Sequence, residues 1–242
     1  MNAALLAELP PEIADVLTMI VNPRARRLTL RVEPQDGRIV LVRPKRFNEA
    51  ALNAFVVSRV DWMLTQLQAL PPHVPFADAT SLPYLGEDHV IRWNAQARGV
   101  QRANGEIVVG GGSEHTARRV RDWFRAEAKR VITPLVHSMA AGVDRKVAHV
   151  TVRDTRSRWG SCARNGRLSF SWRLIFAPED VLIYVAAHEV AHLVHLNHKP
   201  AFWRTVGAVL ENHARTANQP TVDMTLAREW LRRRGAALYR YG

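Results

Sequence analysis

The alternation of apolar and polar residues predicts β-strands near the start of the chain. Residues 16–43 are predicted to form strands, because Leu28, Leu30 and Val32 alternate with Thr29 and Arg31, and the dipeptide Asp36-Gly37 precedes an apolar run over residues 39–42. Asp-Gly is typical of a tight turn, so we expect a hairpin here. From Asn48, a good N-cap residue, apolar side chains recur at helical spacing until Pro71-Pro72. This second pattern predicts one amphipathic helix.

A further extended region is expected over residues 82–109. It contains Asn104-Gly105, a dipeptide that favours a type I′ hairpin turn. Gly110-Gly111-Gly112-Ser113 follows directly and is the most flexible stretch of the sequence. We therefore place a domain boundary there. Residues 1–112 form a β-rich N-terminal portion with one amphipathic helix, and residues 113–242 form a second, catalytic portion.

The second portion is expected to be mostly helical with a short sheet, which makes the fold class α+β. A long helix is predicted to end near Gly142, because apolar residues recur at helical spacing up to that point. Pro178 and the two acidic residues after it suit the first turn of another helix, which we expect to continue through His195. The remaining expected elements are an extended pair over 147–154 and 168–174 and helices over 200–215 and 222–237.

Composition places the 242-residue chain among ordinary globular proteins. It is 47% hydrophobic and 23% charged, and 34 basic against 22 acidic side chains give a formal charge of +12. Acidic partners are therefore worth testing. Cys162 is the single cysteine, so no disulfide framework is expected and a reducing compartment is the default. The first twenty residues do not read as a signal peptide or membrane anchor, and we expect a soluble cytoplasmic protein that does not enter a membrane.

His188-Glu189-Val190-Ala191-His192 is the motif with the clearest chemistry. It lies on the helix expected from Pro178, and its histidines are four residues apart, so both project from one helical face and can reach one metal ion. Glu189 is placed to accept a proton from an attacking water molecule and pass it to a leaving group. Isolated histidines are usually ordinary hydrogen-bonded residues, but four within residues 188–198 beside a glutamate favour a metal site.

A catalytic zinc site needs a third protein ligand and leaves one position open. His195 is about 10 Å along a continuous helix from His188, at 1.5 Å per residue, which is too far for a shared ion. His198 stands between Asn197 and Pro200, where the helix should break and a turn can direct its ring back to the site. His198 is favoured, and Glu211 on the next helix stays open as an alternative. Nitrogen ligands favour Zn²⁺, although nickel, cobalt or iron also suit them.

Several segments resemble one protein family, the YgjP-like metallopeptidases, which are related to the SprT and WLM zinc peptidases. The resemblance is most specific over residues 150–205 and weaker over most of the rest. It rests on Arg-Ser-Arg-Trp-Gly-Ser-Cys at 156–162, Leu-Ser-Phe-Ser-Trp-Arg-Leu at 168–174, the histidine motif, Asn197-His198 and Phe202-Trp203.

The resemblance implies a zincin-like domain. It implies His188, His192 and His198 as zinc ligands and Glu189 as the catalytic base, and a strand beside the metal helix that holds an extended substrate. Arg158 in the first of these segments then becomes a candidate to stabilise an oxyanion or hold an acidic group of the substrate. A tight turn at Gly160 explains the same segment without a catalytic role.

Zinc-dependent hydrolysis of peptide bonds in protein or peptide substrates is thus the function that the sequence favours. Cys162 as a nucleophile is disfavoured, because no separate histidine and orienting residue stand out for it. The basic charge, densest at Arg232-Arg233-Arg234, is mostly a solvated surface but leaves nucleic-acid binding open. Two other functions remain: hydrolysis of nucleotide phosphoanhydrides, and a nucleic-acid-binding module with a structural metal.

Overall fold

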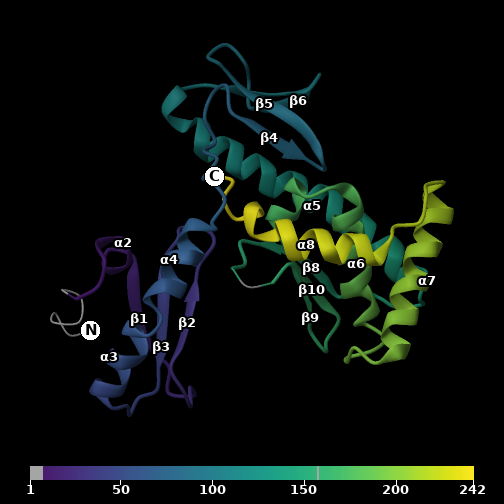
Figure 1. Ribbon diagram of the computed structural model, residues 1–242. Helices are drawn as coiled ribbons and strands as arrows, with labels where there is room; N and C mark the ends of the chain where they lie inside the picture. Colours follow the sequence, from purple (N-terminus) through teal and green to yellow (C-terminus); the bar gives the residue numbers. More distant parts are fainter. Residues whose placement is uncertain (1–7, 157) are drawn as a thin grey trace. The chain divides into compact units, whose positions relative to one another are not determined.

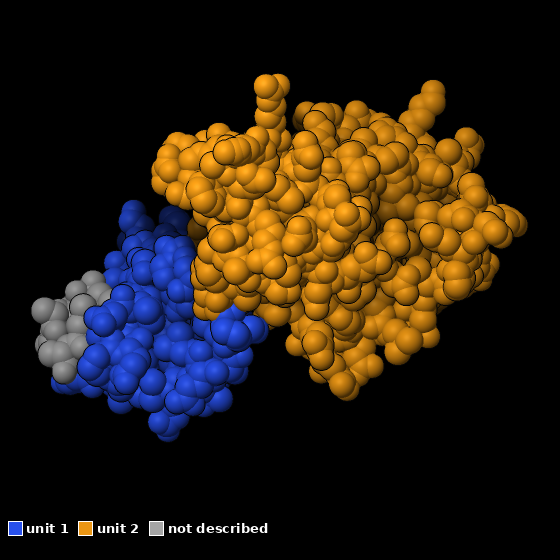
Figure 2. Space-filling view, turned by 90° about the horizontal axis from the view of Figure 1, so that it is seen from above, with its two compact units in different colours: residues 1–72 blue, residues 73–242 orange. Residues whose placement is uncertain are grey.

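The computed structural model describes residues 8–156 and 158–242 and divides into two compact units, residues 1–72 and 73–242 (Figures 1 and 2). Each unit has its own hydrophobic core. The fold is mixed α+β, as the sequence predicts. In the described part of the chain, no helix combines the length and the apolar character that crossing a membrane requires.

The first unit consists of a three-stranded sheet and helices. Its elements are α2 (Pro11–Ala14), β1 (Leu17–Val21), β2 (Thr29–Val32), β3 (Ile39–Arg43), α3 (Glu49–Val57) and α4 (Val60–Gln68). The strand order is β1-β3-β2, in which β2 and β3 form the expected antiparallel hairpin and β1 adds in parallel. Ile39 and Leu41 of β3 pack in one core with Val56 of α3 and Met63 of α4.

The single helix expected after Asn48 is two helices in the structure. The Asn48 side chain does cap α3, since its oxygen accepts a hydrogen bond from the backbone N–H of Ala51 at 3.1 Å. The helix stops at Ser58, whose hydroxyl donates to the carbonyl of Phe55, and the chain turns at Arg59 before α4 begins. No proline or glycine lies at this break, and the apolar residues keep their helical spacing across it. The sequence pattern therefore predicts one continuous helix.

The second unit contains two sheets and the longest helices. The first sheet consists of β4 (Ser81–Tyr84), β5 (Glu87–Asn94), β6 (Val100–Ala103) and β7 (Glu106–Gly110), in the order β4-β5-β7-β6. Asn104 and Gly105 both have positive φ between antiparallel β6 and β7, as a type I′ turn requires. The 3-10 turn η1 (Ser113–His115) then leads into α5 (Thr116–Ala141).

The remaining elements form the region that contains the histidine motif. They are β8 (His149–Arg153), β9 (Gly160–Cys162), β10 (Arg167–Ser171), the 3-10 segment η2 (Trp172–Phe176), α6 (Glu179–Ala191), α7 (Pro200–Ala217) and α8 (Met224–Leu238). In the sheet order β8-β10-β9, the expected pair of strands β8 and β10 is parallel, and β9 adds as an antiparallel edge strand. The extended segment expected to reach Leu174 ends at Ser171, because η2 follows.

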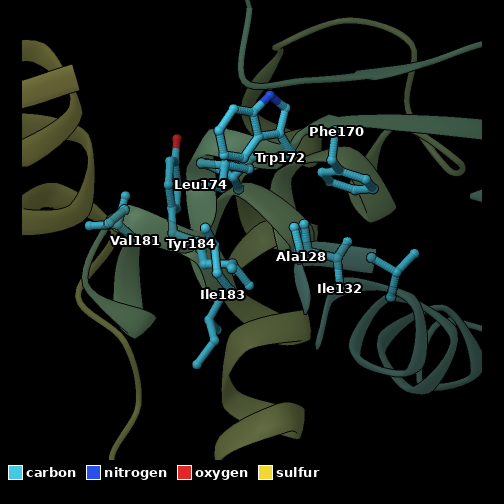
Figure 3. Packing of buried hydrophobic residues seen from close by; sticks show 14 of the residues in the cluster. Ala128, Ile132, Phe170, Trp172, Leu174, Val181, Ile183 and Tyr184 are labelled. Atoms are coloured by element: carbon cyan, nitrogen blue, oxygen red, sulfur yellow. The ribbon is translucent and has the colours of Figure 1, made fainter. Parts of the chain in front are cut away.

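The core of this unit joins α5, β10, η2 and α6. Figure 3 shows Ala128 and Ile132 of α5, Phe170 of β10, Trp172 and Leu174 of η2, and Val181, Ile183 and Tyr184 of α6 packed together. Helix α6 is buried almost all round, and it packs against α5, α7, α8 and β9 (Figure 1). A helix enclosed in this way holds its polar side chains in fixed positions.

The compact units divide at Pro72, whereas the sequence analysis places a boundary at residue 112. Ile107 and Val109 of β7 are fully buried in the same core as Val120 and Phe124 of α5. The glycine stretch is therefore a tight connection within one unit. A glycine-rich stretch indicates local flexibility, but it does not show that the elements before and after it, here β7 and α5, share one core.

Candidate metal centre

Helix α6 positions the first two histidines and the glutamate of the motif. Pro178 precedes its first turn, and Glu179 and Asp180 lie near the positive end of its dipole, as the sequence predicts. His188 and Glu189 lie in its last turn, and His192 is its C-cap residue. The four-residue spacing places the two imidazole rings with their centroids 5.0 Å apart.

The helix ends at Ala191 and does not continue through His195. The N–H of Leu193 bonds to the carbonyl of Val190, three residues back, and the chain then leaves the helical path until Pro200 opens α7. This early end lets the chain turn back within a few residues. The turn brings the Nε2 atom of His198 to 3.2 Å from the Nε2 atom of His188.

His188, His192 and His198 form one cluster. One nitrogen from each ring can be chosen so that all three lie within 4.8 Å of one another. Two nitrogens bound to one tetrahedral ion at 2.0–2.1 Å would be about 3.3 Å apart, close to the distance between His188 and His198. The donor set and its spacing therefore fit a divalent ion of the zinc type. Glu211, the alternative third ligand, lies exposed on α7 and is not part of the cluster.

Neighbouring groups fix the orientation of these rings. The Nδ1 atom of His192 is 2.9 Å from the carbonyl oxygen of His195, and donation to that oxygen leaves Nε2 free to bind a metal. The indole N–H of Trp203 donates to the carbonyl of His198 at 3.1 Å. The ring of Phe202, fully buried, lies 4.5–4.9 Å from all three imidazoles. Both aromatic residues belong to the first turn of α7.

Glu189 lies beside the cluster in an apolar environment. Burial raises the pKa of its carboxyl group to about 7, and the positive charge of Arg158 opposes this rise. Its Oε2 atom is buried and has no hydrogen-bond partner in the described part of the chain. A Cβ atom added at Gly160 of β9 would lie 2.5 Å from the Cγ and Oε1 atoms of Glu189. Only glycine leaves room for the carboxylate at this point.

Burial also affects the histidines. It lowers the pKa of His188 to about 4, and the neighbouring His192, His198 and Arg228 add to this effect. The pKa of His192 is lowered as well, mainly by burial. A neutral imidazole is the form that binds metal ions, so these surroundings favour the ligand form of both rings.

A pocket of about 200 Å³ opens beside His188 and Glu189. Tyr184, Trp159 and Leu231 line it together with these two residues. Tyr184 stands four residues before His188 on α6, so the helical repeat that links the two motif histidines extends to it. Tyr184 is not among the residues that the sequence motifs indicate, although its four-residue spacing from His188 is a signal for it.

The family model for the YgjP-like metallopeptidase domain matches residues 26–219. The chain belongs to the YgjP-like metallopeptidase family. Membership implies a divalent metal ion and protein or peptide substrates. The crystal structure of the metallopeptidase zymogen of Pyrococcus abyssi abylysin matches at 16% identity and a TM-score of 0.30, over 38% of this chain and 100% of that one. Among curated proteins, none matches the sequence.

Two other candidate residues lie near the centre of this YgjP-like metallopeptidase without joining the histidine cluster. Arg158 is exposed and acts on Glu189 through its charge. Cys162 is half-buried, and burial together with the charge of Glu189 raises its thiol pKa to about 11. Such a thiol is almost fully protonated at neutral pH and is a poor nucleophile.

The densest basic run of the YgjP-like chain lies on α8. Arg232 and Arg233 both pair with Glu229 on the same helix, at 3.7 and 2.5 Å. These pairs are of the ordinary surface kind. They give no sign of a nucleic-acid site at this run.

Proposed function

We propose that this chain is a zinc-dependent metallopeptidase in which His188, His192 and His198 bind the ion and Glu189 is the general base. The observation that carries the proposal is the convergence of three imidazoles next to a buried carboxylate. Three nitrogen ligands with one open position are the usual pattern of a catalytic zinc site, whereas structural sites are closed by four protein ligands. The domain is accordingly proposed to be zincin-like.

When bound, the ion supplies Lewis acidity that acidifies water and polarises a carbonyl group. The chain supplies proton transfer. Glu189 accepts a proton from the attacking water and delivers it to the nitrogen of the departing amine, which needs a proton before the C–N bond breaks. Its apolar surroundings suit this role, because a carboxylate deprived of water holds a proton more readily at neutral pH.

Arg158 is proposed to act through its charge on the same site. It opposes the rise in the pKa of Glu189, so it keeps part of this carboxyl group ionised and able to accept a proton. Tyr184 and Trp159 line the pocket in which the residues beside the scissile bond would lie. These side chains bind and orient the substrate, while Glu189 moves the proton.

Glu189→Gln tests the role of the base. The substitution preserves size but removes the proton acceptor, so hydrolysis of an unfolded protein substrate should fall by about a hundredfold to ten-thousandfold. Zinc content, measured by elemental analysis of the same sample, should not change. Substantial residual hydrolysis by Glu189→Gln would contradict the assignment.

The same pair of proteins distinguishes peptide hydrolysis from the two alternative functions, hydrolysis of nucleotide phosphoanhydrides and a nucleic-acid-binding module with a structural metal. Nucleoside triphosphates and unfolded proteins are offered in parallel to the wild-type chain and to Glu189→Gln. Release of phosphate or pyrophosphate by the wild type alone, without cleavage of any protein, would favour hydrolysis of phosphoanhydrides. Metal binding without hydrolysis of either class would favour a structural ion.

A further inference from the structure

One face of the sheet β8-β10-β9 carries hydroxyl groups across all three strands. Thr151 of β8 lies in register with Ser169 of β10, and Ser169 lies in register with Ser161 of β9. The residues between them, such as Leu168 and Phe170, are buried in the core. Because side chains alternate along a strand, the hydroxyl row lies on the face directed away from the core.

A groove of about 520 Å³ lies over this face. Its basic side chains are Arg153, Arg158, Arg167 and His149, and its lining contains no aspartate or glutamate. In the part of the chain that the structure describes, none of these arginines forms a salt bridge. Basic side chains in a groove whose own lining has no acidic residue attract an anionic ligand. The hydroxyl groups of Ser161 and Ser169 add to that attraction, whereas the hydroxyl of Thr151 donates to the carbonyl of Leu168.

The groove and the pocket of the proposed active site are lined by neighbouring residues of β9. Ser161 and Cys162 line the groove, and Gly160, the preceding residue, lies against Glu189. Successive residues of a strand advance by about 3.3 Å. Gly160 faces the side of β9 on which Glu189 lies, and Ser161 faces the groove, so alternate side chains of an extended chain beside β9 would reach the groove next to a peptide bond held at Glu189. β9 is also an edge strand of its sheet, so an extended chain can run beside it.

We propose that this groove binds aspartate or glutamate side chains of the polypeptide substrate, close to the bond that is hydrolysed. Arg153 and Arg167 bind the carboxylate by charge-assisted hydrogen bonds, and the hydroxyl groups of Ser161 and Ser169 complete the site. The chain is then a peptidase that selects acidic segments. The proposal rests on the proposed function, because it assigns the groove to the same substrate.

Binding tests this selectivity without hydrolysis. Full-length, zinc-loaded Glu189→Gln protein is titrated against two fluorescein-labelled twenty-residue peptides, one alternating Glu and Ser and one alternating Gln and Ser, and anisotropy is recorded. The Glu peptide should bind at least tenfold more tightly. Adding Arg153→Gln and Arg167→Gln should remove most of that difference. Arg98→Gln with Lys129→Gln, two exposed basic residues outside the groove, removes equal charge and should preserve it.

Equal affinity for the two peptides, or an equal loss in the control variant, would overturn the proposal. A nucleoside triphosphate and a single-stranded oligonucleotide are titrated in the same way. If the affinity for either of these ligands depends on Arg153 and Arg167 while the affinity for the Glu peptide does not, the groove binds phosphate and the proposal is wrong. Selective binding of the Glu peptide, together with a zinc-loaded wild-type chain that cleaves no protein or peptide, would instead contradict the proposed function alone.

Discussion

Gly160 shows how closely the candidate site depends on a single residue. The sequence around it is compatible with a tight turn, but in the structure Gly160 lies in β9 without a positive φ, and its missing side chain makes room for Glu189. The glycine is required by a close approach of two elements. A pattern confined to the neighbouring residues cannot show which distant side chain lies against it.

Gly160→Ala is therefore expected to displace the proposed base. The added Cβ would be 2.5 Å from the Glu189 side chain, so the carboxylate must move while the histidines keep their places. Peptide hydrolysis should fall at least tenfold with zinc content unchanged. Gly207→Ala is the matched control, because its Cβ meets nothing within 4 Å and alanine stabilises a helix by about 0.5–1 kcal/mol. Equal activity in both variants would exclude this role for Gly160.

Cys162 is expected to be unreactive and dispensable. With a pKa of about 11, only about one thiol in a thousand is ionised at pH 8, so alkylation by iodoacetamide should be much slower than for a free cysteine. Its reaction should speed up as the pH approaches 11. Cys162→Ser should retain hydrolysis. Rapid alkylation at pH 8 that abolished activity would instead support a thiol enzyme.

Helix α6 and its early end decide the geometry of the centre. The motif spacing predicts that His188 and His192 share a face, and Asn197 and Pro200 predict a turn that redirects His198. The exact end of the helix is less visible in the sequence, because Leu193 and Val194 continue its apolar character. The hydrogen bond between the His192 ring and the carbonyl of His195 is possible only because the chain leaves the helical path after Ala191.

Trp203 in the first turn of α7 should support metal binding without touching the ion. Trp203→Phe keeps an aromatic ring but removes the N–H that holds the carbonyl of His198, so zinc affinity should fall by about tenfold. Competition with a zinc chelator measures this. Trp93→Phe loses a similar bond, to the carbonyl of Gly111, and should keep full affinity. Equal affinity in the two variants would show that Trp203 has no supporting role.

Helix α8 contributes residues to the candidate site that the sequence motifs do not indicate. Leu231 lines the pocket beside Glu189, and the guanidinium of Arg228 lies 4.7 Å from the centre of the Trp203 ring. The helix lies beyond residue 219, where the family match ends. Its contribution follows from packing between elements far apart in the sequence, and periodicity within α8 gives no sign of it.

At the scale of the whole chain, the sequence predicts the kinds of element better than their grouping. The hairpins, the long helix α5 and the helices around the motif all occur near the expected positions. The division at Pro72 does not follow from them, because it depends on which elements share a core. All the residues of the candidate centre lie in the unit formed by residues 73–242.

The central claim is that three named imidazoles bind one divalent ion. Elemental analysis of the full-length chain, loaded with zinc and dialysed, tests it most directly. His188→Ala, His192→Ala and His198→Ala are compared with His195→Ala, which alters a ring outside the cluster and leaves the backbone carbonyl that His192 contacts. Far-UV circular dichroism verifies that each variant is folded.

The account predicts one zinc ion per chain in the wild type and in His195→Ala, and a loss of most zinc in each of the other three variants. Full zinc content in any folded one of these three variants would contradict it.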